Sequence, residues 1–190
     1  MARARRRRPR RRPALTLRIT QVDPLPLRDE LREVHRAALG VGAVSDEWAS
    51  ESLPRHLGRQ DFTFLVAEDD ERLIGFGYGY TGAYGQWWTE RVAQAFTVEQ
   101  REEWLDPPHF EVVELHVRPA YQDRGVGSQL LAQLLTRQPH DRALLTSQAG
   151  SRQARGFYAK NGWTEICAVD FGAGYAPYIV LGKLLLAGDA

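Results

Sequence analysis

Residues 111–131 have the composition of an anion-binding turn. A dense apolar strand ends at Val117, and the segment 122–127 leads into a helix with apolar periodicity. The two glycines of that segment let the backbone turn tightly and bring its N–H groups close to a ligand. Arg124 adds a full positive charge, and the helix dipole adds positive potential at the same end. A pyrophosphate suits this place, although a glycine pair can also form a plain strand-to-helix turn. The segment lacks the Gly-Lys-Ser/Thr of a P-loop and the third glycine of the dinucleotide fingerprint.

The strand before this turn carries two glutamates and a histidine. Glu111 and Glu114 are three residues apart, so regular alternation places them on opposite faces of the strand. Glu114 shares a face with His116, and this pair could relay a proton to bulk solvent. The alternative is a solvated or salt-bridged carboxylate without a chemical role.

Short strands and helices alternate along the chain and must position these residues. We expect strands at 15–20, 62–67, 73–80, 110–117, 143–147, 163–171 and 178–185. We expect helices at 27–39, 89–104, 127–137 and 151–161, and a further helix that begins with Ser45 as its N-cap. Within 89–104, a second helix that starts at Thr97 is the alternative. This order predicts an α/β (α+β mixed) domain built on one sheet.

Two segments leave alternatives open. In strand 73–80, glycines alternate with apolar residues, which indicates the close approach of a ligand or of another backbone, or else a bulged or edge strand. The connection that follows concentrates aromatic residues, which either wall a substrate pocket or belong to the core: Tyr84, Trp87, Trp88 and Trp104.

The composition is that of one folded domain. The chain has 190 residues, of which 43% are hydrophobic and 26% are charged, so disorder is excluded for most of it. The single cysteine, Cys167, excludes an internal disulfide and a multi-cysteine zinc site. We therefore expect no metal. No apolar run approaches the length of about 18 residues that a transmembrane helix needs, so no membrane partner is expected.

The first 12 residues are unlike the rest of the chain. They hold eight of the 25 basic residues, all arginine, and no acidic residue. The remainder has 17 basic and 24 acidic residues, a net charge of −7. We expect residues 1–13 to form a disordered tail beside a domain at 14–190. Nucleic-acid contact through residues 1–12 is the functional alternative to a solvated tail or an over-extended start of translation. The tail does not have the apolar stretch of a secretory signal.

Two motifs at a fixed separation resemble the GNAT (Gcn5-related) N-acetyltransferase family. The first is Gln122-x-x-Gly125-x-Gly127, which follows a strand ending in ELHV. The second, SRQARGFYAKNGW, runs from Ser151 to Trp163. The family commonly carries Q/R-x-x-G-x-G/A and then N-x-x-A-x-x-F-Y-x-x-x-G-F. The similarity covers residues 14–186 and implies a single GNAT-like domain, with a central, mostly antiparallel sheet and helices on both faces.

The resemblance implies acetyl-CoA as the donor cosubstrate. It places residues 115–117 along the pantetheine arm, as if the cofactor were an added strand, and residues 123–128 around the pyrophosphate. The residues that it assigns to the cofactor are Leu115, His116, Val117, Gln122, Asp123, Arg124, Gly125, Val126, Gly127, Ser128, Ser151 and Tyr158.

The resemblance also suggests the catalytic groups. Tyr158 falls where the family keeps a tyrosine beside the thioester sulfur, and its phenol could protonate the departing thiolate. A core tyrosine is the alternative. Family members often place a base on the strand that carries Glu114, so we predict Glu114 as the general base, with His116 as the second choice and proton transfer through water also open.

Two residues depart from the family pattern. Ser151 stands where many members have asparagine, which makes a cofactor contact from its shorter side chain less certain. Thr146 stands where the ribosomal-protein N-terminal acetyltransferases usually keep a glutamate base, which argues against that subgroup.

We therefore predict a cytoplasmic N-acetyltransferase, monomeric or homodimeric, that acetylates a primary amine by direct attack in a ternary complex. The acceptor is expected to enter from the side of the sheet bordered by residues 81–110. A small-molecule amine is the first expectation, whether an antibiotic amine or an amino-acid derivative, and a protein lysine or N-terminus stays open. The alternative function is a non-catalytic CoA-sensing or nucleic-acid-binding module that uses the basic tail.

Overall fold

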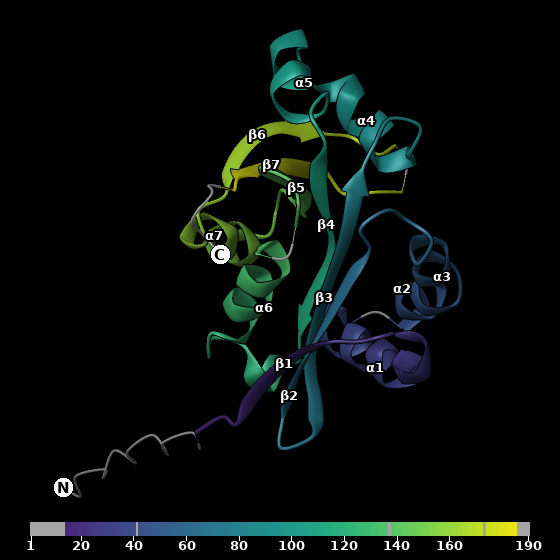
Figure 1. Cartoon of the computed structure of the whole chain (residues 1–190), viewed down its shortest axis with the longest axis vertical. Helices are drawn as coiled ribbons and strands as arrows, with labels where there is room; N and C mark the ends of the chain where they lie inside the picture. Colours follow the sequence, from purple (N-terminus) through teal and green to yellow (C-terminus); the bar gives the residue numbers. More distant parts are fainter. Residues whose placement is uncertain (1–13, 41, 137, 173, 186–190) are drawn as a thin grey trace, which may run out of the picture.

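The computed structural model describes residues 14–40, 42–136, 138–172 and 174–185 (Figure 1). The expected tail, residues 1–13, lies outside the described residues. The strands are β1 (Leu17–Gln21), β2 (Thr63–Asp69), β3 (Arg72–Gly82), β4 (His109–Val117), β5 (Arg142–Gln148), β6 (Thr164–Val169) and β7 (Tyr178–Leu184). The helices are α1 (Arg28–Leu39), α2 (Gly42–Glu47), α3 (Leu53–His56), α4 (Trp87–Ala95), α5 (Val98–Trp104), α6 (Val126–Leu135) and α7 (Arg152–Lys160).

The strands form one mixed sheet in the order β1-β2-β3-β4-β5-β7-β6. Neighbouring strands are antiparallel except for β4 and β5, which are parallel. Helices α1–α3 lie on one side of the long strands and α6 and α7 on the other (Figure 1). The predicted fold class, a mixed and mostly antiparallel sheet with helices on both faces, is therefore confirmed.

Both faces of the long strands are buried, which explains their almost continuous apolar sequence. In β2, Phe64 and Val66 pack with α1 and the residues after it, whereas Leu65 and Ala67 pack with α6 on the opposite face. A third cluster joins α4 and α5 to β5 and β7 and includes Trp104. The three clusters hold the sheet between its helices and fix the position of β4.

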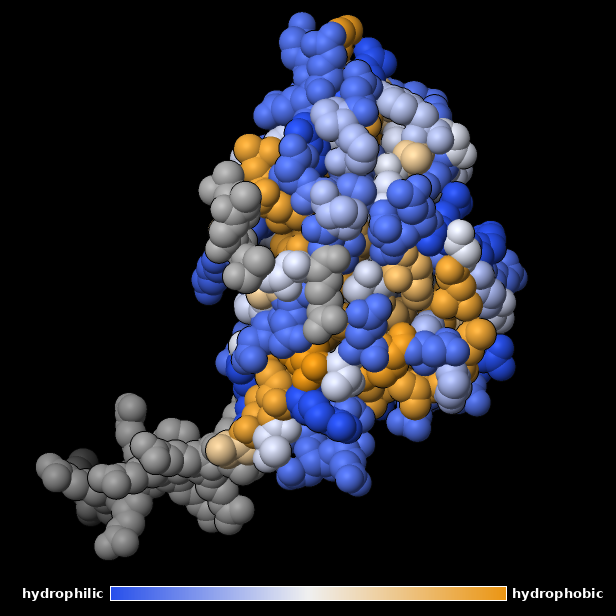
Figure 2. All heavy atoms as spheres, viewed as in Figure 1, coloured by the Kyte–Doolittle hydropathy of each residue, from blue (hydrophilic) through white to orange (hydrophobic). Residues whose placement is uncertain are grey.

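The segment between β3 and β4 forms two helices rather than one. Thr97 caps α5: its side chain accepts a hydrogen bond from the Gln100 N–H, and the Gln100 side chain accepts one from the Thr97 N–H. This capping box stops the chain from continuing the helix of α4, so the expected single helix over 89–104 is wrong and the second start at Thr97 is confirmed. Figure 2 shows mostly hydrophilic side chains around α5, at the top of the view. Its first residue, Val98, is an exposed hydrophobic residue, and Trp104 is its buried one.

The predicted N-cap at Ser45 is wrong. Ser45 lies inside α2 and is fully buried. Its hydroxyl oxygen is 2.9 Å from Nδ1 of His35, so the side chain bonds to α1 rather than to its own helix start. A π-helical turn at Trp48–Ser52 joins α2 to α3.

The glycines of β3 mark the close approach of another backbone. A Cβ at Gly79 would lie 2.2 Å from the Glu111 carbonyl oxygen, and one at Gly75 would lie 2.8 Å from the His116 carbonyl oxygen. Both oxygens belong to β4. The structure therefore shows the approach of a neighbouring strand, and it also shows a bulge in β3, because Ala67 pairs with Gly75 and Glu68 with Leu73.

A bulge in β4 changes which side chains share a face. Tyr78 pairs with Glu114, but the next residue, Gly79, pairs with Val112, so Val113 is an extra residue in β4. As a result Glu111 pairs with Tyr80 and Glu114 with Tyr78. Since alternate residues of β3 point to one side, the expectation that Glu111 and Glu114 lie on opposite faces is wrong. The inserted residue shifts the alternation by one position.

Strand β4 loses its second neighbour along most of its length. The register between β4 and β5 includes Phe110 with Ala143 and Glu111 with Leu144 and no further pair among the described residues. Beyond Glu111, β4 keeps β3 as its partner, while β5 pairs with β7 along its whole length. The sheet therefore opens between the two parallel strands, beside residues 112–117.

Candidate active site

The glycine-containing turn ends at the start of α6 with backbone N–H groups left over. Gly125 is the N-cap with φ +83°, and Asp123 has φ +57°, so the chain passes twice through the left-handed region before the helix begins. The N-cap supplies no side-chain hydrogen bond. The first N–H groups of α6 therefore have no capping side chain and, with the helix dipole, form a place suited to an anion.

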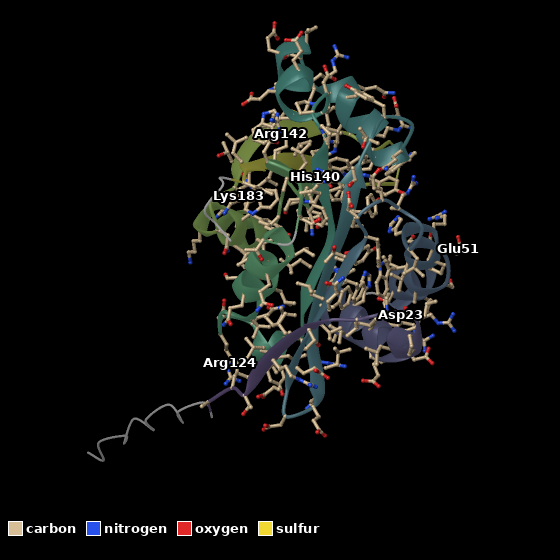
Figure 3. The ribbon with its side chains drawn as sticks, viewed as in Figure 1. Asp23, Glu51, Arg124, His140, Arg142 and Lys183 are labelled. Atoms are coloured by element: carbon tan, nitrogen blue, oxygen red, sulfur yellow. The ribbon has the colours of Figure 1, made fainter. Side chains whose placement is uncertain are left out.

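Arg124 brings the positive charge that the sequence suggested to this turn. Its guanidinium lies over the Tyr121 ring, 5.8 Å from the ring centroid. Figure 3 shows Arg124 near the lower end of the molecule, well away from His140, Arg142 and Lys183, which lie toward the upper end. Of the basic residues labelled in Figure 3, Arg124 is thus the one that lies near the start of α6.

Three of the predicted cofactor residues can offer only their backbone. The side chains of Val117 and Val126 belong to the core on the α6 face. The side chain of Leu115 packs against the same core. These residues shape the opening between β4 and β5 and leave main-chain atoms as their polar groups.

Two other predicted cofactor residues hold the local structure together. The Gln122 side-chain amide donates to the Val117 carbonyl at 3.0 Å and so ties the turn to the end of β4. Ser151 caps α7 by accepting a hydrogen bond from the Ala154 N–H at 3.2 Å. Serine is a preferred N-cap residue, which accounts for its presence where relatives have asparagine.

Gly127 permits a close contact between α6 and α7. A Cβ at this position would lie 3.3 Å from Cε2 of Phe157. A larger side chain would therefore push against the Phe157 ring before it reached any ligand. Substitution of Gly127 combines a packing effect with a binding effect, and Ser128, the partly buried next residue of the first turn, is the cleaner position for a charge.

Tyr158 lies on α7 with its ring edge-on to Phe157 and Trp163, at centroid distances of 5.1 and 5.9 Å. Burial raises the pKa of its hydroxyl, and the negative charge of Glu114 raises it further. The hydroxyl is therefore protonated at neutral pH and within electrostatic reach of Glu114. The ring packs against the α6-side core, whereas Glu114 shares the face of Tyr78, so the two groups lie on opposite faces of the sheet.

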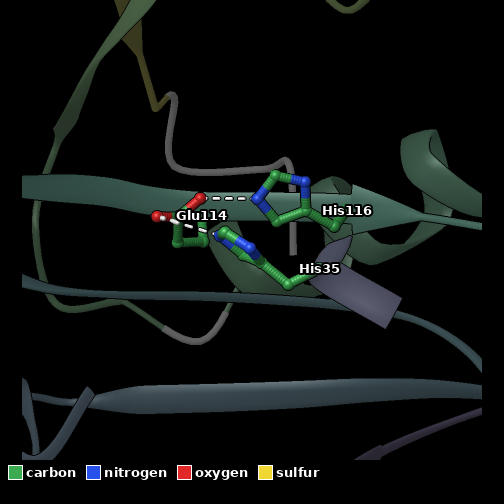
Figure 4. Close-up of side chains that lie close together, drawn as sticks. All are labelled: His35, Glu114 and His116. Carbon is green, nitrogen blue, oxygen red and sulfur yellow. Dashed lines mark hydrogen bonds and ion pairs between the residues drawn. The ribbon is translucent and has the colours of Figure 1, made fainter. Parts of the chain in front are cut away.

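Glu114 lies between two histidines (Figure 4). Its Oε2 is 2.6 Å from Nε2 of His116, and its Oε1 is 3.9 Å from Nε2 of His35. The exposed fractions are 1% for His35, 11% for the His116 side chain and 26% for that of Glu114. Of the three side chains, that of Glu114 is the most exposed. The sequence-predicted pair is brought together, and His35 is an additional member.

The partners of Glu114 set its protonation state. Burial acts to raise the pKa of Glu114, but the hydrogen bonds and charges of His116 and His35 outweigh it and lower the pKa to about 2. The carboxylate is therefore ionised at neutral pH. With a pKa this low the carboxylate is a weak base, so the imidazole of His116 is the basic member of the pair.

His35 is the functional candidate that the sequence reasoning missed. Its ring stacks on Trp48, with centroids 4.7 Å apart and planes within 5°, and meets His116 edge-on at 4.6 Å. Its Nδ1 is bonded to Ser45. The available signal was its position one helical turn after Leu31, on the apolar face of the predicted helix, where a histidine needs a polar partner.

The described residues carry a second buried carboxylate on the same face. Glu111 accepts a hydrogen bond from the Tyr80 hydroxyl at 3.4 Å, and its Oε2 has no hydrogen-bond partner among the described residues. Burial raises the pKa of Glu111 to about 8. A neutral carboxyl costs less to bury than a carboxylate, so Glu111 is protonated at neutral pH and differs in charge from Glu114.

Thr146 and the aromatic segment have structural partners. The Thr146 hydroxyl accepts a hydrogen bond from the Trp88 indole at 3.2 Å, which ties α4 to β5. Trp104 is buried in the core, whereas Tyr84 and Trp87 are about half exposed. The core alternative holds for Trp104 and not for the two exposed rings.

Known proteins share both the sequence pattern and the fold. The sequence profile of the Acetyltransferase (GNAT) family matches residues 27–163. GCN5-like protein acetyltransferase Rv2170 of Mycobacterium tuberculosis (strain ATCC 25618 / H37Rv) is 32% identical over 124 residues, which are 60% of this chain. The chain spans 59% of the length of that curated relative.

Solved structures of low sequence identity share the fold over almost the whole chain. A GNAT-family protein from Desulfovibrio desulfuricans has a TM-score of 0.66 at 15% identity and covers 90% of this chain and 100% of its own. The ribosomal-protein-S18-alanine N-acetyltransferase of Escherichia coli has a TM-score of 0.63 at 14% identity, covering 91% and 97%. The PaiA N-acetyltransferase of Thermoplasma acidophilum, solved in complex with coenzyme A, has a TM-score of 0.57 at 17% identity, covering 90% and 99%.

The solved structures and this chain thus share one α/β fold. With its profile match over more than half of the residues, the chain belongs to the Acetyltransferase (GNAT) family. None of the helices in the described part of the chain combines the length and apolar character needed to cross a membrane.

Proposed function

We propose that this acetyltransferase transfers the acetyl group of acetyl-CoA to a primary amine by direct attack in a ternary complex. The observation that carries the proposal is the opening between β4 and β5, which starts after Glu111 and has the Glu114–His116 pair and Tyr158 on its two sides. An extended chain with amide groups can add to a free strand edge through main-chain hydrogen bonds. The pantetheine arm has such amides and would lie along residues 115–117.

The start of α6 would hold the pyrophosphate of the cofactor. The uncapped N–H groups after Gly125 and the charge of Arg124 both favour an anion there. The PaiA relative, which shares this fold, was solved with coenzyme A bound. Gln122 and Ser151 would support the site by holding the turn and the start of α7 in place.

The chain's own groups can balance the protons of the transfer. The amine nitrogen attacks the thioester carbonyl carbon, and the carbon–sulfur bond breaks. The Glu114–His116 pair accepts the proton that the amine loses, and the Tyr158 hydroxyl donates one to the departing thiolate. Each proton transfer by a positioned side chain typically contributes about 10²–10⁴-fold.

A small-molecule amine is the proposed acceptor, and a protein amine is the second candidate. The observation that favours the second is the name of the 32% identical relative, which is called a protein acetyltransferase. The ionised Glu114 beside the opening between β4 and β5 would attract a cationic amine of either kind. A panel with small polyamines, amino-acid derivatives and lysine-containing peptides, each followed by release of free CoA thiol and by product mass, separates the two.

The first test is binding of the donor. At acetyl-CoA concentrations of about 100 times Kd, the free energy of unfolding should rise by about 2.7 kcal/mol. A clear stabilisation followed by thiol release with at least one amine supports the enzyme. The absence of any acetyl-CoA effect would contradict the proposal and favour a non-catalytic module.

A further inference from the structure

The His35–Glu114–His116 cluster has the donor set of a divalent metal site. Its ligand atoms, two imidazole nitrogens and a carboxylate oxygen, all lie within 4.8 Å of one another. Nitrogen and oxygen donors of this kind bind Zn²⁺. Three protein ligands with a fourth position left open are the pattern of an accessible zinc site rather than of a closed structural one.

The distances require only a small adjustment. Tetrahedral Zn²⁺ with ligand bonds of about 2.0 Å has its donor atoms about 3.3 Å apart. Glu114 Oε2 and His116 Nε2 are 2.6 Å apart, and Glu114 Oε1 and His35 Nε2 are 3.9 Å apart. A common ion therefore needs Glu114 and His116 to move apart and the carboxylate to turn one oxygen toward both histidines, within the 4.8 Å that already encloses the three donor atoms.

Residues around the cluster orient the His35 ring. Metal-binding histidines usually donate their other ring N–H to an oxygen, which fixes the tautomer with a free lone pair toward the metal. The Ser45 hydroxyl oxygen, 2.9 Å from Nδ1 of His35, can accept such a hydrogen bond. The stacked Trp48 ring fixes the plane of His35.

We propose that His35, Glu114 and His116 bind Zn²⁺ and that the bound ion inhibits the enzyme by occupying the pair that accepts the amine proton. The binding half of this proposal stands on the three donor atoms alone. The inhibition half rests on the proposed function. In the bound state the ion replaces the hydrogen bond between Glu114 and His116, and the acceptor amine finds no free lone pair on either group.

Metal binding can be tested without any acetylation assay. The full chain, stripped with a chelator, is titrated with Co²⁺ and then with Zn²⁺ as the competitor. We expect one equivalent of Co²⁺ with the intense visible absorption of a four-coordinate ion, displaced by one equivalent of Zn²⁺. Calorimetry gives the Zn²⁺ affinity of each variant, and circular dichroism confirms that each is folded.

Four variants locate the site. Ser45→Ala should weaken Zn²⁺ binding by about 10–100-fold, the usual effect of a lost outer hydrogen bond. His35→Asn and His116→Asn should weaken it more. His140→Gln is the matched control, because His140 Nε2 also faces a carboxylate, Asp61, at 3.7 Å but belongs to no cluster of three donors within the described part of the chain. Equal loss in the control, or full-strength binding in both His35→Asn and His116→Asn, would overturn the proposal.

Inhibition is measured separately. If the wild type acetylates an amine, Zn²⁺ should abolish turnover, and the Zn²⁺ concentrations for half-maximal inhibition and half-maximal binding should agree. EDTA should then restore turnover. Acetylation without Zn²⁺ binding refutes the metal site and leaves the function intact. Zn²⁺ binding without inhibition refutes the regulatory role, and Zn²⁺ binding in a chain that never acetylates refutes the proposed function while the metal site stands.

Discussion

Glu111 and Glu114 lie on the same face of β4, although they are three residues apart, because Val113 is an extra residue in the strand. The two carboxyl groups nevertheless have opposite protonation states. Glu111 is enclosed with only the Tyr80 hydroxyl as its partner, and burial raises its pKa to about 8. Glu114 has two histidines beside it, and they lower its pKa to about 2. One strand thus presents a neutral acid and an anion side by side.

The neutral state of Glu111 predicts how stability depends on pH. The unfolded chain releases this proton near the ordinary value of 4.5, whereas the folded chain keeps it up to about pH 8. Between these values the folded state binds more protons, so the free energy of unfolding falls as pH rises and levels off above 8. The slope is at most about 1.4 kcal/mol per pH unit.

Denaturant unfolding of Glu111→Gln at several pH values between 5 and 8.5 tests this prediction. Glutamine has the same shape and does not ionise, so the variant should gain stability relative to the wild type as pH rises. Glu102→Gln, at an exposed position on α5, is the control and should keep the wild-type slope. Parallel curves for the wild type and Glu111→Gln would show that Glu111 is not protonated in the folded chain.

The parts of the site that follow from local sequence were predictable. The turn at residues 122–127 and the start of α6 depend on neighbouring glycines, and the two helices around Thr97 depend on a capping box within four residues. Each is decided by hydrogen bonds and backbone angles near the residue itself. Such signals survive in a single sequence because no distant contact is needed to form them.

The parts of the site that depend on distant contacts were not predictable. Val113 becomes an extra residue only against β3, since no residue type in β4 marks the bulge. His35 joins Glu114 across 79 positions of sequence, through the packing of α1 on the sheet. Ser45 looked like a helix cap because its type suits one, and its burial against His35 overrides that local preference.

Charge placed at the start of α6 should weaken acetyl-CoA binding without unfolding the chain. Ser128→Glu puts a negative charge in the first turn, where it repels a pyrophosphate but interacts favourably with the helix dipole. Gln129→Glu is the matched control: it makes the same change in charge at an exposed residue of the same turn. We expect at least a tenfold rise in Kd for Ser128→Glu, measured by calorimetry, and a much smaller one for the control. Equal effects of the two variants would argue against a phosphate site at this turn.

Tyr158→Phe should separate chemistry from binding. The ring contacts with Phe157 and Trp163 remain in the variant, and the hydroxyl has no hydrogen-bond partner among the described residues, so stability and acetyl-CoA affinity should hardly change. Loss of a proton donor should lower kcat by about 10²–10⁴-fold. Tyr84→Phe, which removes an exposed hydroxyl bonded to Asp106, is the control for the substitution itself. A kcat equal to that of the wild type would remove the proton-donor role from Tyr158.

Glu114 and His116 should behave as one unit in catalysis. Glu114→Gln removes the charge that orients the imidazole, and His116→Asn removes the group on which the proton rests, so each should lower kcat while leaving acetyl-CoA affinity unchanged. Because each group works through the other across a 2.6 Å hydrogen bond, the double variant should be little slower than the slower single variant. Steady-state kinetics in the presence of EDTA, which keeps bound metal from masking the effect, measure all four proteins. If kcat of the double variant fell by the product of the two single-variant reductions, the two residues would act independently. Glu114 would then accept the amine proton directly, and His116 would have another role.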